Sequence, residues 1–339
     1  MTGKVIEEAR PRPGVATRPM AARSRYRLVE RLIPILMITP SIIAIAVFVY
    51  GFIGWTTVVS VSRWQGIVPD LSFAGFRNYA ALLTSYRFQS DIRNTIVFTV
   101  FFLIGSLSIG LLLAVLLDSK VRGESFFRTV YLFPMALSFV VTGTVWQWLF
   151  TPGTPGQPTG LNLLFEQIGL PVFQTWSTVS HVWPGGGWKP EWLRVPFGVP
   201  LAMIPVIIAA IWQMSGFTMA MYLAGLRAIP DELREAARVD GASEWQVFRW
   251  ITFPLLQPVT LSAVIVLGHI SLKIFDLIMT QTGGGPGFAT DVPGIFMYET
   301  TFKSNKYAEG AAVAIVMLLM VSVLIVPYLI WRLRTETER

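Results

Sequence analysis

The sequence predicts an all-α integral membrane protein with six transmembrane helices. Hydrophobic residues make up 53% of the 339 residues and charged residues only 14%, whereas soluble domains carry about 25% charged residues. A helix needs about 20 mostly apolar residues to cross the roughly 30 Å hydrocarbon core of a bilayer. Six stretches without a charge meet this requirement: residues 32–62, 94–117, 129–150, 195–226, 251–272 and 310–331.

The first stretch is interpreted as an uncleaved membrane anchor. It is preceded by 31 residues, and it is longer than the roughly 7–15 apolar residues of a secretory signal. Residues 1–31 contain eight basic residues. This composition predicts a cytoplasmic tail that is held close to anionic membrane lipid.

The distribution of basic residues predicts the orientation. One side of the membrane receives 18 of the 27 Lys and Arg residues, in segments 1–31, 118–128, 225–250 and 332–339. The segments on the other side hold seven, and residues 151–197 form the longest of these outer loops. By the positive-inside rule, both termini are cytoplasmic and residues 32–331 form the six-helix domain. The net charge of +7 therefore reflects topology, and nucleic acid is not an expected partner.

Residues 229–258, between the fourth and fifth stretches, predict two short helices. Pro230 suits the first turn of a helix, and Gly241 provides the permissive backbone that ends it. Ser243 is followed three residues later by Gln246, which is the capping-box pattern at the start of a second helix.

The same loop resembles the EAA motif of ABC importer permeases. The pattern of this motif is E-A-A-x₃-G-x₉-I-x-L-P, where x is any residue. The residues that match this spacing are Glu235, Ala236, Ala237, Gly241, Ile251 and Pro254, and Phe253 stands where the pattern has Leu. The resemblance implies six helices of the ABC importer permease type. It also implies that the cytoplasmic loop 229–253 docks on a separate ATPase subunit, which binds ATP-Mg, and that Asp240 belongs to the contact. An amphipathic helix that lies on the membrane is the alternative.

The chain lacks the residues of a catalytic or cofactor site. No G-x-x-x-x-G-K-[ST] phosphate loop occurs. There is no cysteine, and the two histidines, His181 in an outer loop and His269 in a span, form no metal-ligand or nucleophile–base pattern. We therefore expect a transport subunit that is not an enzyme and binds no cofactor or metal of its own.

Two further segments resemble carbohydrate permeases of the maltose-permease type. Residues 73–95 match at Phe73, Gly75, Asn78, Tyr79, Phe88, Asn94 and Thr95. Residues 275–302 match at Phe275, Asp276, Thr282, Gly284, Gly285, Pro286, Thr290, Tyr298 and Phe302. Within the family, residues 210–227 and 268–277 look most like glucose/mannose permeases. The resemblance implies a sugar importer in a bacterial or archaeal cytoplasmic membrane, with a second permease subunit, an ATPase dimer and an extracytoplasmic sugar-binding protein as partners.

Polar residues inside the predicted spans are candidates for a substrate path, because ionisable groups are costly to place in a membrane. The candidates are Trp212, Gln213, Ser215, Lys273, Phe275 and Asp276. If the fifth helix continues to residue 278, Lys273 and Asp276 share a face with His269. Their polar groups would bind sugar hydroxyls, and the aromatic rings would line the pocket. A Lys–Asp pair that fixes helix packing, and Gln213 and Ser215 as contacts between helices, are the alternatives.

Two other functions stay open. A proton-coupled secondary carrier would use Lys273 and Asp276 and need no ATPase, and a membrane anchor for a complex would transport nothing. Neither requires a docking helix between the fourth and fifth spans, so the EAA spacing favours the importer. An oligosaccharide or glycerol phosphate is an alternative substrate.

Overall fold

The computed structural model describes residues 34–119, 122–151, 153–154, 157–169, 182–183 and 194–337, with backbone alone for Trp183 and residues 331–337. The predicted tail 1–31, residues 170–181 and 184–193 of the predicted outer loop, and the last two residues lie outside the described residues. The chain divides into two units, Met1–Trp55 and Thr56–Arg339, which are described separately.

The first described helix runs from Pro34 to Ser60 and is long and apolar enough to cross a membrane. It contains the π-helical segment η1 (Ala46–Gly51), which α2 (Phe52–Ser60) follows. The prediction for residues 32–62 is thereby confirmed as a helix over its described residues, and this helix ends at Ser60, two positions before the predicted end.

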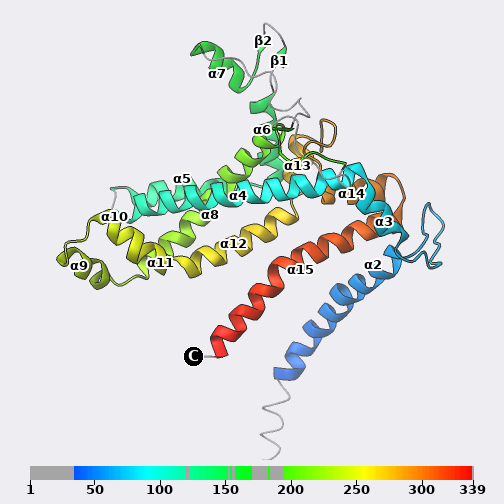
Figure 1. Ribbon diagram of the computed structural model, residues 1–339, viewed down its shortest axis with the longest axis horizontal. Coiled ribbons are helices and arrows are strands. Elements are labelled where there is room, and N and C mark those ends of the chain that lie inside the picture. Colours follow the sequence, from blue (N-terminus) through cyan, green and yellow to red (C-terminus); the bar gives the residue numbers. More distant parts are fainter. Residues whose placement is uncertain are drawn as a thin grey trace, which may run out of the picture. The chain divides into compact units, whose positions relative to one another are not determined.

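Three further long helices in the described chain can cross a membrane: α4 (Tyr86–Asp118), α8 (Met203–Arg227) and α15 (Tyr307–Thr337). α4 and α8, which cross in Figure 1, pack closely against each other. Small residues permit this close approach, because a Cβ atom at Gly110 would collide with Thr218 and one at Gly105 with Ile211. Thr218 Oγ1 donates a hydrogen bond of 2.7 Å to Ser106 O across the contact.

The third predicted span is not one straight helix, which corrects the prediction for residues 129–150. It consists of α5 (Glu124–Ala136) and α6 (Phe139–Phe150), which meet at an angle of 97°. Pro134 weakens the last turn of α5 because it cannot donate a backbone hydrogen bond. Ser138 is extended, and its Oγ accepts a hydrogen bond of 3.2 Å from Val141 N, which caps α6.

The fifth span begins as a continuous helix made of α10 (Glu244–Val247), η2 (Phe248–Thr252) and α11 (Phe253–Leu255). This helix bends by 59° into α12 (Gln257–Leu272). After three non-helical residues, the chain forms α13 (Asp276–Gln281). The prediction that the fifth helix continues to residue 278 is therefore wrong. The residues after Leu272 have no local signal that ends a helix, but packing ends it there. Ile274 and Leu277 are buried in the core, with 6% and 0% of their surface exposed.

The other elements are short. The helices are α3 (Arg77–Thr84), α7 (Leu161–Gln167), α9 (Asp231–Val239), α14 (Pro293–Tyr298) and η3 (Glu299–Lys303). Two antiparallel strand pairs join β1 (Gly153–Thr154) to β2 (Gln157–Pro158) and β3 (Val182–Trp183) to β4 (Val199–Pro200). Because β4 precedes it, α8 begins at Met203, eight residues after the predicted start at residue 195. Counting each bent pair as one span, the described chain holds up to six membrane-crossing segments.

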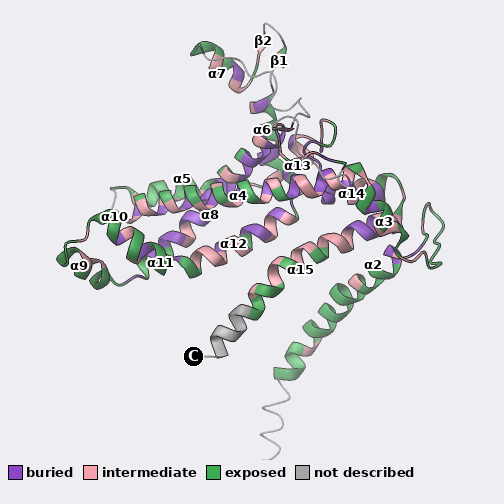
Figure 2. Cartoon of the chain, viewed as in Figure 1, coloured by how far each residue is buried: buried purple, intermediate pink, exposed green. Residues whose placement is uncertain are grey.

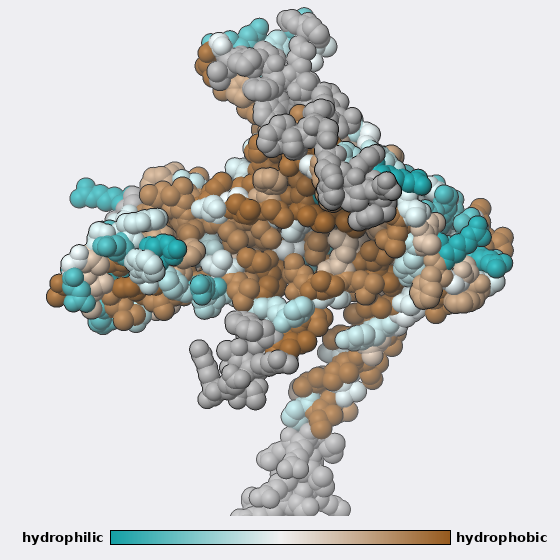
Figure 3. Space-filling view, viewed as in Figure 1, coloured by the Kyte–Doolittle hydropathy of each residue, from teal (hydrophilic) through white to brown (hydrophobic). Residues whose placement is uncertain are grey.

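The main core lies where α4, α8, α12 and α13 meet, and its buried residues are visible in Figure 2. Phe98 and Phe102 of α4 stack there with ring centroids 5.3 Å apart. Other large apolar side chains point outward, as Leu112 does at 58% exposure. Figure 3 shows apolar surface over the middle of the helices, and hydrophilic surface around α9 and α10 at one end and around α3 at the other. An apolar band between polar ends is what a bilayer requires.

Candidate functional site

The EAA loop, residues 229–253, forms the two helices expected of it. α9 ends at Val239, and Gly241 has a φ of +84°, a conformation that favours glycine. α10 starts at a complete capping box, in which Ser243 Oγ accepts a hydrogen bond from Gln246 N. Gln246 Oε1 in turn accepts one from Ser243 N at 2.7 Å. The predicted end of the first helix and start of the second are confirmed.

The motif residues lie on an accessible surface. Glu235, Ala236, Asp240, Gly241 and Pro254 are exposed, and Ala237 and Ile251 are half-buried. Among the described residues, none makes a hydrogen bond or ion pair with the Glu235 carboxylate. Nearby Val239, Trp245 and Trp250 are 87%, 69% and 72% exposed. A free carboxylate beside unburied apolar side chains fits contact with another protein.

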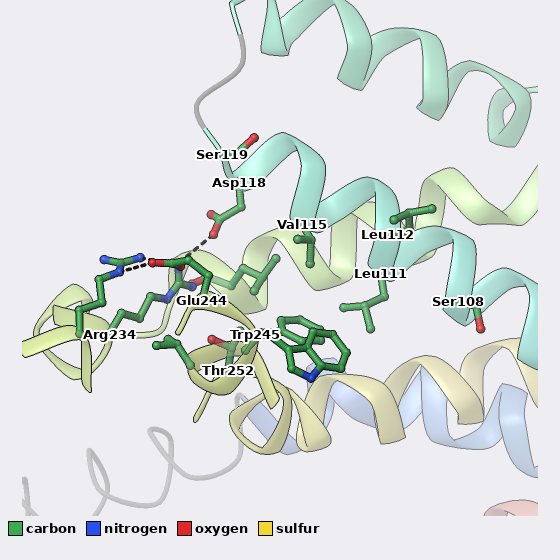
Figure 4. A pocket seen from close by; sticks show the side chains of 14 residues that line it. Ser108, Leu111, Leu112, Val115, Asp118, Ser119, Arg234, Glu244, Trp245 and Thr252 are labelled. Atoms are coloured by element: carbon green, nitrogen blue, oxygen red, sulfur yellow. Dashed lines mark hydrogen bonds and ion pairs between the residues drawn. The ribbon is translucent and has the colours of Figure 1, made fainter. Parts of the chain in front are cut away.

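Two arginines of the EAA loop form ion pairs, and Figure 4 shows Arg234 beside Asp118. Arg234 Nη1 lies 2.9 Å from Asp118 Oδ2 at the end of α4, and Arg234 Nη2 donates to Leu226 O of α8 at 2.9 Å. The side chains of this ion pair are only 16% and 20% exposed. Arg238 pairs with Glu244 at 2.7 Å, with exposures of 48% and 74%. Arg234 therefore joins α9 to two spans, whereas the second pair stays within the loop.

A third set of ion pairs joins α5 to α8 next to the EAA loop. Glu124 Oε1 lies 2.6 Å from Arg227 Nη2 and also pairs with Arg128, one turn along α5. The ends of α4, α5 and α8 are therefore all linked by charged side chains at this end of the bundle.

Replacing Arg234 by leucine is expected to destabilise the chain more than replacing Arg238 by leucine. The first change leaves Asp118 mostly buried without its partner, and hydrogen bonds to charged groups contribute about 1.5–3 kcal/mol. An exposed ion pair such as that of Arg238 contributes about 0–1 kcal/mol. Thermal unfolding of the detergent-solubilised variants measures the difference. Equal shifts of the melting temperature would contradict a role of Arg234 as the anchor.

A second polar site, which was not predicted from the sequence, lies at the other end of α4. Arg87 Nε lies 2.5 Å from Asp291 Oδ2, and Arg87 Nη2 lies 2.7 Å from Glu299 Oε2. Its guanidinium also lies 4.9 Å and 4.8 Å from the ring centroids of Phe288 and Phe296. Arg87 therefore joins the first turn of α4 to the segment that follows α13.

Asn94 holds the same segment through its backbone. Its Nδ2 donates to Phe288 O and to Asp291 O, both at 2.8 Å. Asp91, one turn earlier on α4, is 0% exposed, and its carboxylate has no hydrogen-bond partner among the described residues. The sequence signal was a cluster of charged residues immediately before the uncharged stretch that starts at residue 94.

The two carboxyl groups that pair with Arg87 differ in their pKa. Burial raises the pKa of the Asp291 carboxyl above its ordinary value, and the ion pair with Arg87 opposes part of this rise. The pKa of Glu299 is lowered, chiefly by the hydrogen bond from Arg87. Arg87 therefore favours the ionised form of both groups.

Gln213 and Ser215, two of the candidates for a substrate path, make contacts within the helix bundle. Gln213 is 2% exposed, and its Nε2 donates to Leu137 O at 2.8 Å, where α5 and α6 meet. Ser215 Oγ donates to Trp212 O within α8 at 3.2 Å. Among the described residues, no hydrogen bond or ion pair joins the side chains of any two of the six candidates. Gln213 satisfies a carbonyl that the broken helix leaves free.

The other candidates lie nearer the surface of the chain. Lys273 and Asp276 are exposed, and neither side chain has a hydrogen bond or ion pair with a described residue. The predicted Lys–Asp pair is therefore not formed, because the helix ends between the two residues. Trp212 packs edge-on against Trp146, and Phe275 packs in the same way against Tyr298. A role of these residues in binding substrate stays a prediction.

The membrane-crossing helices place the protein in the class of multi-pass helical membrane proteins. Residues 106–334 match the family described as binding-protein-dependent transport system inner membrane component. The chain belongs to this family.

Similar proteins extend over nearly the whole chain. A probable ABC transporter permease protein of Pyrococcus horikoshii is 43% identical over 302 residues, which cover 89% of this chain and 96% of the relative. The xylose/arabinose import permease protein of Haloferax volcanii is 36% identical over 293 residues, or 86% of this chain and 84% of the relative. A crystal structure of a bacterial ABC transporter involved in the import of alginate has a TM-score of 0.69 at 22% identity and covers 90% of this chain and 96% of that one. The structural likeness shows a shared fold.

Proposed function

We propose that this chain is the transmembrane permease subunit of an ATP-driven, binding-protein-dependent sugar importer. The observation that carries the proposal is the EAA loop, an accessible two-helix segment that Arg234 fastens to α4 and α8. The name of the Haloferax volcanii relative, a xylose/arabinose import permease protein, supports a sugar as the substrate class.

The proposed mechanism separates ATP hydrolysis from transport. An extracytoplasmic binding protein delivers sugar to the outer face of this subunit and a second permease. An ATPase dimer, which holds ATP-Mg, closes and displaces residues 229–253. Arg234 passes this displacement to the ends of α4 and α8, and the spans switch from inward-open to outward-open. In this arrangement the chain lies in the cytoplasmic membrane, with the EAA loop and both termini in the cytoplasm.

Glucose or mannose is the proposed substrate. The resemblance of residues 210–227 and 268–277 to glucose/mannose permeases supports this choice. The exposed side chains of Trp212, Lys273 and Asp276 leave aromatic and hydrogen-bonding groups available to a sugar. A pentose, an oligosaccharide or glycerol phosphate is the alternative substrate.

Co-purification with the ATPase, followed by an activity assay, tests the proposal. Wild-type chain should retain the ATPase, and Glu235→Lys should lose it, because the substitution reverses an exposed, unpaired charge on α9. Glu166→Lys is the control, because Glu166 is exposed on α7, outside the EAA loop. In liposomes that contain the whole transporter and its binding protein, glucose or mannose should stimulate ATP hydrolysis.

The outcomes of this assay separate the alternatives. Stimulation by another sugar alone would retain the importer and reject glucose and mannose. Uptake that needs no ATPase and stops when an uncoupler is added would replace the importer with a proton-coupled carrier. Retention of the ATPase by Glu235→Lys would remove the EAA loop from the contact.

A further inference from the structure

A cavity of about 740 Å³ lies between the last turns of α4 and the helix that begins at α10. One wall consists of the apolar side chains of Leu111, Leu112 and Val115 of α4. In Figure 4, Leu111 and Val115 point toward Trp245 on the opposite wall, and Leu112 lies at the edge of the cavity. We call this space the α4–α10 cavity. All of its lining residues belong to the second unit of the chain.

The position of the α4–α10 cavity relates it to the bilayer. α4 is a membrane-crossing helix that ends at Asp118. Leu111 therefore lies about 10 Å from the end of the helix, at about 1.5 Å per residue. Leu112 is 58% exposed, so the apolar wall is open to whatever lies beside the helix. The cavity thus has an apolar part within the span and a polar part at its end.

The polar end of the cavity carries charges of both signs. Asp118 and Arg234 form a mostly buried pair, and Arg238 and Glu244 form an exposed one, so the four side chains have no net charge. An exposed ion pair contributes little to stability, so its partners can exchange contacts at little cost. A ligand with only negative charge would meet repulsion from Glu244. A ligand that carries a phosphate and an ammonium group offers one partner to Arg238 and one to Glu244.

We propose that the α4–α10 cavity binds one phospholipid with a zwitterionic, ammonium-bearing headgroup, from the leaflet on the side of the EAA loop. An acyl chain lies along Leu111, Leu112 and Val115. The phosphate pairs with Arg238, and the ammonium pairs with Glu244. Such a lipid contacts a membrane span and the EAA loop together, so the composition of the membrane sets how firmly this loop is held. The proposal requires only that the chain spans a membrane, and it does not depend on the transported substrate.

Native mass spectrometry of the full chain, purified with the subunits that accompany it, tests this proposal. The protein is incubated with equal amounts of dioleoyl phosphatidylethanolamine and dioleoyl phosphatidylglycerol, and the lipids that remain bound are counted. Wild type should retain one phosphatidylethanolamine. Leu112→Trp, which fills the cavity, should reduce this occupancy by at least about tenfold. Leu116→Trp is the matched control, because Leu116 is 54% exposed one turn further along α4 and does not line the cavity.

A headgroup variant provides the second readout. Glu244→Gln removes the charge that faces the ammonium, and it should abolish the preference for phosphatidylethanolamine over phosphatidylglycerol. Folding should persist, because the Glu244 side chain is 74% exposed. Equal retention of the two lipids by wild type, or equal loss in Leu112→Trp and Leu116→Trp, would overturn the proposal. So would a photocrosslinker at position 112 that captures a polypeptide in place of a lipid.

Discussion

Gly241→Asp should abolish ATP-driven uptake and leave the chain folded in the membrane. The chain itself has room for a side chain at this turn, since a Cβ atom on Gly241 would meet nothing within 4 Å. A residue other than glycine at a φ of +84° costs only about 1–2 kcal/mol. The carboxylate would instead enter the surface that we propose to contact the ATPase. Uptake by proteoliposomes that contain the whole transporter should fall by at least about tenfold.

Gly123→Asp provides the matched control for backbone strain. Gly123 has the same φ of +84°, and a Cβ atom there would make only an ordinary contact of 4.0 Å with Phe127. It precedes α5 and lies outside the EAA loop. Uptake by Gly123→Asp should therefore stay close to that of wild type. Similar losses in the two variants would assign the effect to the strained backbone and not to the ATPase contact.

Arg87→Met should lower the free energy of unfolding by about 3–5 kcal/mol, because removing one partner of a buried ion pair leaves a charge without compensation. The Asp291 side chain is only 1% exposed and loses its ion pair. Lys303→Met is the control, because it removes a pair with Glu299 in which Lys303 is 52% exposed, and such pairs contribute about 0–1 kcal/mol. Thermal unfolding in detergent compares the variants. A loss for Arg87→Met no greater than that for Lys303→Met would refute the expectation.

The loss in Arg87→Met should depend on pH. Without Arg87, burial and the negative charge of Glu299 raise the pKa of Asp291, and of the groups that lower it only the hydrogen bond from Val292 N remains. The pKa of Asp291 in the folded state therefore rises further above that of the unfolded chain. The folded state then binds a proton more tightly than the unfolded state does, and stability returns as the pH falls toward the ordinary carboxyl pKa of about 4. The difference in melting temperature from wild type should therefore be smaller near pH 5 than near pH 7.5. A difference that grows on acidification would contradict this account.

Local signals predicted the features of this fold that depend on neighbouring residues. Uncharged length alone located the helix that ends at Ser60 and most of α4. It placed the start of α4 at residue 94, eight residues after the observed start at Tyr86, because the first turns of α4 carry charged residues. The end of α9 two residues before Gly241 followed from the backbone preference of glycine, and the capping box of Ser243 followed from groups three residues apart.

Features that depend on distant residues could not be predicted in the same way. Arg87 and Asp291 are 204 positions apart, so the sequence shows their charges but not their pairing. Between Leu272 and Asp276, neither glycine nor proline marks the end of the helix, and burial of Ile274 decides it. The break after Pro134 had a signal, but the long apolar run concealed it.

The break in the third span affects how a displacement travels through the protein. α5 is tied to α8 by Glu124 and Arg227, whereas α6 packs on α13 so closely that a Cβ atom at Gly143 would collide with Thr280. Axial movement of α5 therefore reaches a joint at Leu137, where the direction changes by 97°. Such a joint converts a push along one helix into a sideways swing of the next. An unbroken helix would carry the same push only along its own axis.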